Sequence, residues 1–210
     1  MIPTAIAVSI FLGVSTSHLF LQAQTAADAV VSQLRELPTP LPATGPSDGR
    51  IPAIEQRRRE LYRQLWLLGA DALPALASGL SDPDVRLRRN VALVLNVLAG
   101  GWFDRLQPKL DIRACLPALI AALKDNDADV RARSAQAIGL IGRDATAAVL
   151  ALILLLRNER EGSRNSAALA LGGIGSAAKE ALPALREALS DPSPDVRRFA
   201  EGAIKKIEER

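Results

Sequence analysis

Residues 116–142 read LPALIAALKDNDADVRARSAQAIGLIG, and this stretch decides the fold. Its apolar residues recur every three or four positions, which is the period of an amphipathic helix, and a polar turn at 125–129 interrupts them. The stretch therefore predicts two short helices joined by a turn. The inward positions are Leu116, Leu119 and Leu123 in the first helix, and Val130, Ser134, Ile138 and Ile141 in the second.

The same unit recurs 33 residues downstream, 33 residues further on, and 43 residues upstream. A helical hairpin this small cannot bury its apolar side alone, so copies must stack against one another. We predict an all-α fold, an α-solenoid of about four to five stacked helical hairpins within residues 54–210. The expected copies are 54–69, 70–100, 113–144, 145–176 and 178–208.

The composition suits such a stack. Hydrophobic residues make up 49% of the chain and aromatic residues only 3%, so the interior must consist of Ala, Leu, Ile and Val. Lys and Arg together number 26 against 23 for Asp and Glu, a balance too even to indicate a nucleic-acid-binding protein by itself. The single cysteine, Cys115, rules out an intramolecular disulfide and a Cys-rich zinc site, and its place in a helix pattern predicts a small buried residue.

The N-terminal segment carries an uncharged apolar run. Residues 2–23 contain no Lys, Arg, Asp or Glu. We expect residues 1–24 to be a signal peptide or a membrane anchor, with possible membrane association through 2–23. The protein is then exported to the periplasm or secreted, or it is anchored. A misassigned start or a buried helix of a cytoplasmic protein is the alternative.

Residues 25–53 are expected to form a short helix and a Pro-rich linker. Ala26, Val30, Leu34 and Leu37 give the helix one apolar side, so it could begin a capping half-repeat. Five prolines between Pro38 and Pro52 prevent a helix or a central strand there. We interpret that stretch as a surface spacer preceding the repeats.

The first copy is degenerate and carries a dense positive run. Leu61, Leu65 and Leu68 occupy the places of Ser134, Ile138 and Ile141. Arg58 and Arg59 lie beside Tyr62 in a run that we predict to be exposed and able to bind phosphate or an acidic protein surface. In the alternative interpretation, Trp66 plugs the end of the stack and the arginines are solvated or paired.

An aspartate and an arginine stand six residues apart across each clear turn. We expect each Asp to cap the second helix and each Arg to reach the neighbouring repeat, which gives a ladder of charges along the stack. The predicted members are Asp82 with Arg88, Asp125 with Arg131, Asp191 with Arg197, and Arg164, whose copy has Asn158 at the aspartate position.

These features resemble the HEAT repeat, in particular the short phycobilisome-lyase-type HEAT-like repeat. The motif stands here as Leu182-Pro183-Ala184-Leu185, Leu189-Ser190-Asp191-Pro192 and Asp195-Val196-Arg197. The resemblance covers about residues 54–208 and implies the fold. It does not imply one function, because such families include scaffolds, accessory subunits that attach chromophores, and deoxyhypusine hydroxylase.

The sequence offers no set of catalytic residues. The hydroxylase family that resembles this fold holds two irons with His-Glu pairs, and this chain has only His18, which lies outside the repeats. Ser-His or Cys-His pairs and a P-loop are also missing. Gly175 aligns with Gly142 as a stop between repeats, so Gly172-Gly173-Ile174-Gly175 predicts turn and packing chemistry rather than a phosphate site. We predict no catalytic or metal-binding residue and no cofactor.

Two further features bear on packing and binding. Gly139, Gly172 and Gly202 fall inside second helices, where close approach of neighbouring helices would offset their cost. The longer first spacing places an insertion at 101–112, and insertions of repeat proteins often emerge at the binding face. Trp102, Phe103 and Arg105 are therefore candidate partner contacts, unless Trp102 folds back over the groove between repeats.

We expect a non-enzymatic scaffold or adaptor that binds a protein of unknown identity through its inner, second-helix surface and the 101–112 insertion. An accessory subunit of an enzyme such as a prosthetic-group lyase is one alternative. The other is a solenoid that binds phosphate or nucleic acid through Arg57 to Arg63 and the Arg133, Arg160 and Arg198 surface. Nucleic acid is the less favoured of these partners, because few exported proteins meet it.

Overall fold

The structure is a computed structural model that describes residues 16–38, 53–101, 108–157 and 161–209. Within these ranges it is helical and contains no strand. Most of the predicted leader, the linker from 39 to 52, and the candidate contacts Trp102, Phe103 and Arg105 lie outside the described residues. The prediction of an all-α solenoid is confirmed for the described part of the chain.

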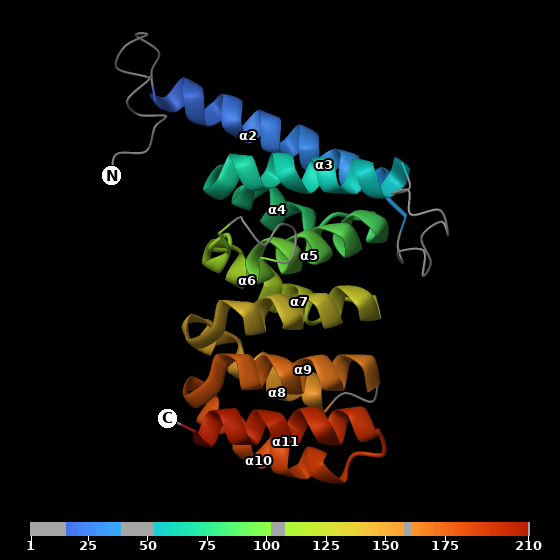
Figure 1. Cartoon of the computed structure of the whole chain (residues 1–210), viewed down its shortest axis with the longest axis vertical. Coiled ribbons are helices and arrows are strands. Elements are labelled where there is room, and N and C mark those ends of the chain that lie inside the picture. The colour runs from blue at the N-terminus through green and yellow to red at the C-terminus, as the bar shows by residue number, and fades with distance from the viewer. Residues whose placement is uncertain (1–15, 39–52, 102–107, 158–160, 210) are drawn as a thin grey trace.

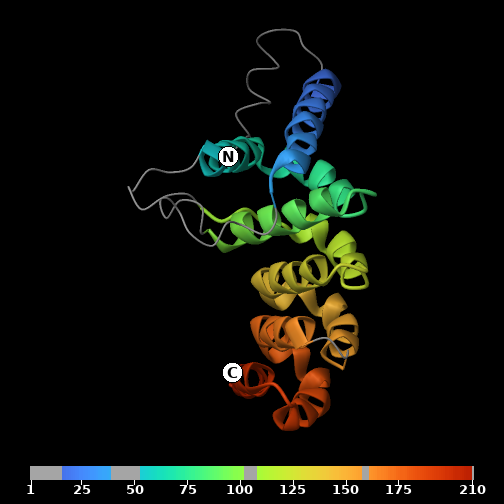
Figure 2. The same cartoon turned by 90° about the vertical axis from the view of Figure 1, so that its right-hand side faces the viewer.

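The helices pair into successive hairpins that stack in single file (Figure 1). Figure 2 shows the two layers from the side, with the second helix of each hairpin on the inner side of a gently bowed column. The first helices are α2 (Thr16–Gln33), α4 (Leu73–Gly79), α6 (Leu116–Ala122), α8 (Val149–Leu156) and α10 (Leu182–Glu187). The second helices are α3 (Ala53–Leu68), α5 (Val85–Gly100), α7 (Ala128–Ile141), α9 (Glu161–Ile174) and α11 (Pro194–Glu208).

Local sequence sets where these helices begin and end. Asp84, Asp127 and Ser193 cap α5, α7 and α11, because each side chain accepts a hydrogen bond from a free backbone amide of the first turn. A proline in the first turn of α4, α6 and α10 needs no amide hydrogen there. Gly142 and Gly175 have φ of 75° and 68°, so the predicted stop at both positions is confirmed.

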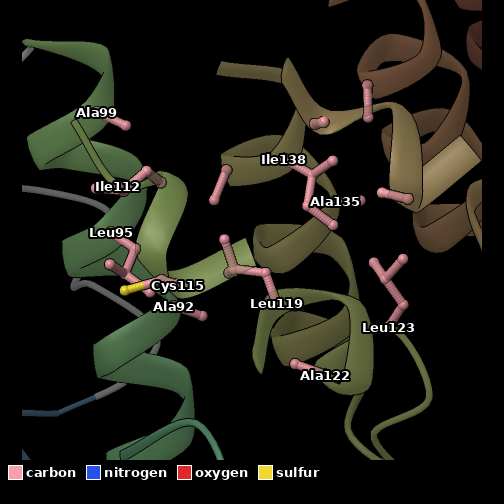
Figure 3. Packing of buried hydrophobic residues seen from close by; sticks show 14 of the residues in the cluster. Ala92, Leu95, Ala99, Ile112, Cys115, Leu119, Ala122, Leu123, Ala135 and Ile138 are labelled. Carbon is pink, nitrogen blue, oxygen red and sulfur yellow. The ribbon is translucent and has the colours of Figure 1, made fainter. Parts of the chain in front are cut away.

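The core is one continuous apolar interior. The equivalent leucines of four successive first helices, Leu76, Leu119, Leu152 and Leu185, are all 0% exposed. Figure 3 shows how neighbouring repeats share this interior, with Leu95 of α5, Cys115, Leu119 of α6 and Ile138 of α7 in one cluster. Each hairpin therefore buries its apolar side only because the next one covers it.

One stretch, Ala128–Leu156, is long and apolar enough to cross a membrane by length and composition. It is not one straight helix, because Gly142 has a positive φ and Ala145 is non-helical between α7 and α8. The two halves belong to successive hairpins, and Val130, Ile138 and Leu152 are fully buried in the stack. We assign the stretch to the solenoid core.

Glycine permits backbone contact between α7 and α9. A Cβ on Gly139 would lie 2.9 Å from Cα of Ala170, and a Cβ on Gly172 would lie 3.0 Å from Cα of Ala203 in α11. The predicted close approach is thus confirmed at both glycines. It is wrong for Gly202, where a Cβ would meet nothing within 4 Å, because that position faces away from the neighbouring helices.

Candidate protein-binding surface

In the predicted polar ladder, two bidentate Arg–Asp ion pairs join neighbouring repeats. Arg88 donates from Nε and Nη2 to the two carboxylate oxygens of Asp125 in the next repeat, at 2.7 and 3.1 Å. Arg164 does the same to Asp191, at 2.8 and 2.9 Å. These side chains are largely shielded from solvent, so the pairs hold the register of the stack more firmly than exposed pairs would.

The ladder aspartates do not cap their helices as predicted. Asp125 accepts from the amide of Asp127, and Asp191 accepts from the amide of Ser193, two residues further on in each case. The caps are Asp127 and Ser193 themselves. The aspartates therefore fix the turn that precedes the cap, because a short carboxylate can fold back onto an amide two residues ahead.

Three of the ladder arginines, Arg88, Arg131 and Arg197, also tie down the turn of their own hairpin. Nη1 of Arg88 donates to the carbonyl oxygen of Asp82 at 2.8 Å, and Nη1 of Arg197 donates to that of Asp191 at 2.7 Å. Arg131 follows the same pattern, with 2.6 Å to the carbonyl oxygen of Asp125. The six-residue spacing across the turn thus brings the guanidinium back over the turn carbonyls.

Arg131 differs from the other rungs on its far side. Its Nε lies 3.3 Å from Oγ of the buried Ser163, whereas Arg88 and Arg164 meet a carboxylate there. Arg131 is 4% exposed, so its charge is held mainly by hydrogen bonds to neutral groups. Asn158, at the aspartate position of this copy, lies outside the described residues.

The ladder reaches further toward the N-terminus than the sequence pattern indicated. Arg35 pairs with Asp82 at 2.9 Å, so the segment after α2 joins the first clear repeat. Arg58 occupies the register position of Arg131 and Arg88, and it donates to the carbonyl oxygen of Pro38 at 3.1 Å and to Glu55 at 2.8 Å. Aligning Leu61 with Ser134 already implied this, because Arg58 and Arg131 each stand three residues earlier.

A second set of contacts runs beside the ladder and escaped the sequence analysis. Arg89, one residue after the ladder position, donates from Nε to Asp127 at 2.9 Å. The hydrogen bond from Arg89, together with the backbone amides that Asp127 accepts from as the cap of α7, holds the pKa of this carboxyl below its usual range. The signal in the sequence was the doubled arginine at 88 and 89 opposite two aspartates at 125 and 127.

The prediction that the α3 arginine run is exposed is wrong for part of the run. Arg58 and Tyr62 are 3% and 4% exposed, because Arg58 is held against Pro38 and Glu55 and Tyr62 packs in the apolar core. Burial raises the pKa of the Tyr62 hydroxyl to about 12. Arg59 is exposed and pairs with Glu55 of the same helix, and Arg63 pairs with Glu60. These pairs favour the alternative interpretation, in which the arginines of α3 are paired.

Trp66 is partly buried at the same seam. Its indole nitrogen donates to the carbonyl oxygen of Pro108 at 3.0 Å, which ties α3 to the end of the 101–112 insertion. This contact agrees with the predicted plug. Trp66 and Tyr62 therefore fill the space between α3 and its neighbours.

A shallow hollow of about 370 Å³ crosses the inner surface of α5, α7, α9 and α11. Leu140, Gly173 and Lys206 hold the same register position in three successive second helices, so the hollow lies where α9 lacks a side chain. Leu169, 40% exposed, forms one of its apolar walls. The lining residues are Asn96, Gln136, Gly139, Leu140, Leu169, Ala170, Gly173 and Lys206.

Polar groups stand at the two ends of this hollow. At one end, Asn96 is 2% exposed, its amide nitrogen donates to the carbonyl oxygen of Arg133 at 2.6 Å, and its Oδ1 is buried without a hydrogen-bond partner in the described structure. At the other end Lys206 is exposed. The lining contains one charged residue, this lysine, and no carboxylate.

The chemistry-bearing residues that remain are few. Cys115 is fully buried, and burial raises the pKa of its thiol to about 11, which agrees with the predicted structural role. In the described ranges, no group of three or more His, Cys, Asp or Glu side chains could hold a metal ion.

Comparison with known proteins identifies the repeats. Residues 115–207 match the family model of HEAT repeats. No curated protein sequence matches the chain at a significant level.

Three solved structures show the breadth of similar folds. A designed armadillo repeat protein in complex with the peptide (KR)4 is 18% identical, with 87% of this chain and 82% of that chain covered and a TM-score of 0.59. The complex of CpcE and CpcF of phycocyanin lyase from Nostoc sp. PCC7120 is 24% identical, with 81% of this chain and 71% of that chain covered and a TM-score of 0.55. Kap121p is 18% identical, with 88% of this chain and 21% of that chain covered and a TM-score of 0.58. The chain is thus a helical solenoid similar to armadillo and HEAT repeat proteins, and its residues 115–207 are HEAT repeats.

Proposed function

We propose that this protein is a non-enzymatic scaffold that binds a segment of another protein along the inner surface of its second helices. The observation that supports this most directly is the hollow across α5, α7, α9 and α11, which combines apolar walls with polar ends. Its volume of about 370 Å³ falls within the range of about 300–1,000 Å³ that is common for ligand sites.

The similar solenoids support the same proposal. One of them holds a peptide, and another is a complex of two lyase subunits. A column of parallel helices offers equivalent side chains at a regular spacing, which suits an extended chain lying across the helices. The insertion residues Trp102, Phe103 and Arg105 adjoin this surface in sequence and belong to the proposal as further partner contacts.

A role as an accessory subunit of a prosthetic-group lyase has one observation in its favour, the similarity of fold to the CpcE and CpcF complex. That role also needs a protein-binding surface, so it is a special case of the same proposal. For phosphate or nucleic acid, the α3 arginines are less suited than the sequence indicated, because Arg58 is buried and Arg59 and Arg63 pair with glutamates.

The test is selection from a random peptide display library on the folded chain, with no bias in peptide charge. Selected peptides should lose binding when Leu169 on the inner surface becomes Asp, and keep it when Leu150 on the outer surface becomes Asp. The pair is matched, because both leucines are exposed helix residues, at 40% and 66%. Failure to select any peptide, or loss of binding only in the Leu150 variant, would contradict the proposal.

A further inference from the structure

We infer that the partner of the inner-surface hollow is an extended protein segment with an aliphatic side chain flanked by a carboxylate. This inference rests on the proposed function and names the chemistry of the segment that the hollow accepts. The observations behind it are the gap at Gly173, the charge of the rim, and the unused polar group of Asn96.

The shape of the hollow follows from one missing side chain. The register position that carries Val97, Leu140 and Lys206 on the neighbouring helices carries Gly173 on α9. No larger residue fits there, because a Cβ on Gly173 would lie 2.5 Å from the carbonyl oxygen of Gly139. Close packing of α7 against α9 therefore leaves a permanent gap between Leu140 and Lys206, of a kind that a side chain from another molecule can fill.

The walls of the gap select the side chain. Leu140, Leu169 and Ala170 present methyl groups, and Gly139 and Gly173 present bare backbone. Removing such a surface from water favours an aliphatic group, because a polar one would lose its hydration without gaining a partner. Leu169 is 40% exposed and gains most from being covered.

The rim selects the charge beside it. Lys206 is exposed at one end of the hollow, and at the other end Asn96 binds the backbone carbonyl of Arg133. With no carboxylate in the lining, the local potential is positive and favours an acidic neighbour of the aliphatic side chain. A leucine with a carboxylate beside it matches this arrangement.

Asn96 supplies a group suited to the backbone of such a segment. Its amide nitrogen is committed to the carbonyl oxygen of Arg133, which fixes the side chain, and Oδ1 accepts nothing within the described structure. A buried acceptor without a donor costs free energy. A hydrogen bond from a peptide N–H to this oxygen would therefore contribute more to the binding free energy than one to a solvent-exposed acceptor. An extended strand supplies that donor.

The experiment measures binding of three short capped peptides to the full chain by fluorescence anisotropy. The first carries one leucine flanked on both sides by glutamates, the second replaces the leucine by serine, and the third replaces the glutamates by lysines. We expect the first peptide to bind, and the second and third to bind at least about tenfold more weakly.

Two charge-matched variants locate the site. Lys206→Glu should weaken the first peptide by about fivefold or more, whereas Lys205→Glu should change it less than about twofold. Lys205 is the fair control, because it stands next on the same helix, pairs with Glu209 and does not line the hollow. Helical circular dichroism and thermal unfolding of both variants check that the fold is kept.

The outcomes separate this inference from the proposed function. If the library of random peptides yields inner-surface binders that are basic, or if Lys206→Glu and Lys205→Glu act alike, the inner surface still binds protein segments and the inferred chemistry is wrong. If no peptide binds the inner surface at all, both are wrong.

Discussion

At the seam between α7 and α9 the backbones of two helices touch, whereas at the seam between α3 and α5 aromatic side chains fill the contact. The positions of α7 that face the next repeat are Arg131, Ala135 and Gly139, and the same positions of α3 are Arg58, Tyr62 and Trp66. Gly139 meets Cα of Ala170 directly, while Tyr62 is 4% exposed and Trp66 reaches the carbonyl oxygen of Pro108. One register thus accepts two kinds of packing.

The difference shows what is essential to the stack. The arginine is kept at both seams, and in both it donates to a carbonyl oxygen of the preceding turn, of Pro38 for Arg58 and of Asp125 for Arg131. The other two positions, one and two turns after the arginine, differ together between the seams. A large residue at one of them would hold the helices too far apart for a glycine at the other to make contact. Within the matched repeats, α7 and α9 use small residues at these positions, Ala168 and Gly172 in the case of α9, and α3 lies outside that match.

The largest loss of stability is expected from a substitution in the apolar core, and it tests the helical register assigned to α7. Ile138 of α7 is 0% exposed and lies in the apolar layer between neighbouring repeats (Figure 3). Ile138→Ala should lower the free energy of unfolding by roughly 2–5 kcal/mol, because it opens a cavity that a rigid stack closes poorly. Chemical denaturation measures the change. An unchanged midpoint would show that the helical register assigned to α7 is wrong.

The next effect compares a buried rung of the ladder with an exposed one. Arg131 is 4% exposed and Arg197, at the same register position of α11, is exposed, yet both bind the carbonyls of their own turn. Arg131→Ala should cost about 2–3 kcal/mol, because it removes the buried guanidinium that binds the carbonyls of the turn and the buried Ser163 hydroxyl. Arg197→Ala should cost less than about 1 kcal/mol, since water replaces the guanidinium.

Both arginine variants are to be compared by urea unfolding under the same conditions. Equal losses would mean that the arginine acts within its own turn alone and that its burial between repeats contributes nothing. A larger loss for Arg197 would contradict the assignment of Arg131 as a shielded rung.

A matched pair of glycines tests the backbone contact itself. Gly139→Ala should destabilise by about 1–3 kcal/mol, because its Cβ would lie 2.9 Å from Cα of Ala170 and the two helices must separate. Gly202→Ala should stabilise by about 0.5–1 kcal/mol, because that Cβ meets nothing within 4 Å and alanine favours the helix. Thermal unfolding distinguishes them by the sign of the shift in Tm. A rise in Tm for both would show that α7 and α9 are not in contact.

The sequence predicted the stack because its signal is periodic. Leu119, Leu152 and Leu185 stand at equal spacing, and their burial follows from helix geometry alone. The partners of Arg88 and Arg164 could also be predicted, because the repeat spacing places each arginine opposite an aspartate of the next copy. Regular positions can be predicted because each repeat supplies the context for the next.

The irregular positions were harder to predict, for reasons that are equally physical. Exposure of Arg58 and Tyr62 depended on which side of α3 the next hairpin covers, and charge alone suggested the solvent side. The hollow at Gly173 required two facts at once, the missing side chain and the approach of Gly139. Glycine in a sequence predicts freedom of approach but not which neighbour approaches, so this candidate site could only be found in three dimensions.

The smallest effect expected is a pH dependence of the rung between Arg164 and Asp191. Hydrogen bonds from Arg164 hold the pKa of the Asp191 carboxyl below its usual range of about 3.9. The unfolded chain therefore binds a proton at higher pH than the folded one, so this pair stabilises the fold fully above about pH 5 and loses its contribution as pH falls through the lowered pKa. Asp191→Asn removes the titrating group, and stability measured from pH 5 down to pH 2 should then fall less steeply than in the unaltered chain. Identical pH profiles for the two proteins would mean that Asp191 gains nothing from Arg164 on folding, which would leave the ladder as a set of hydrogen bonds to turn carbonyls.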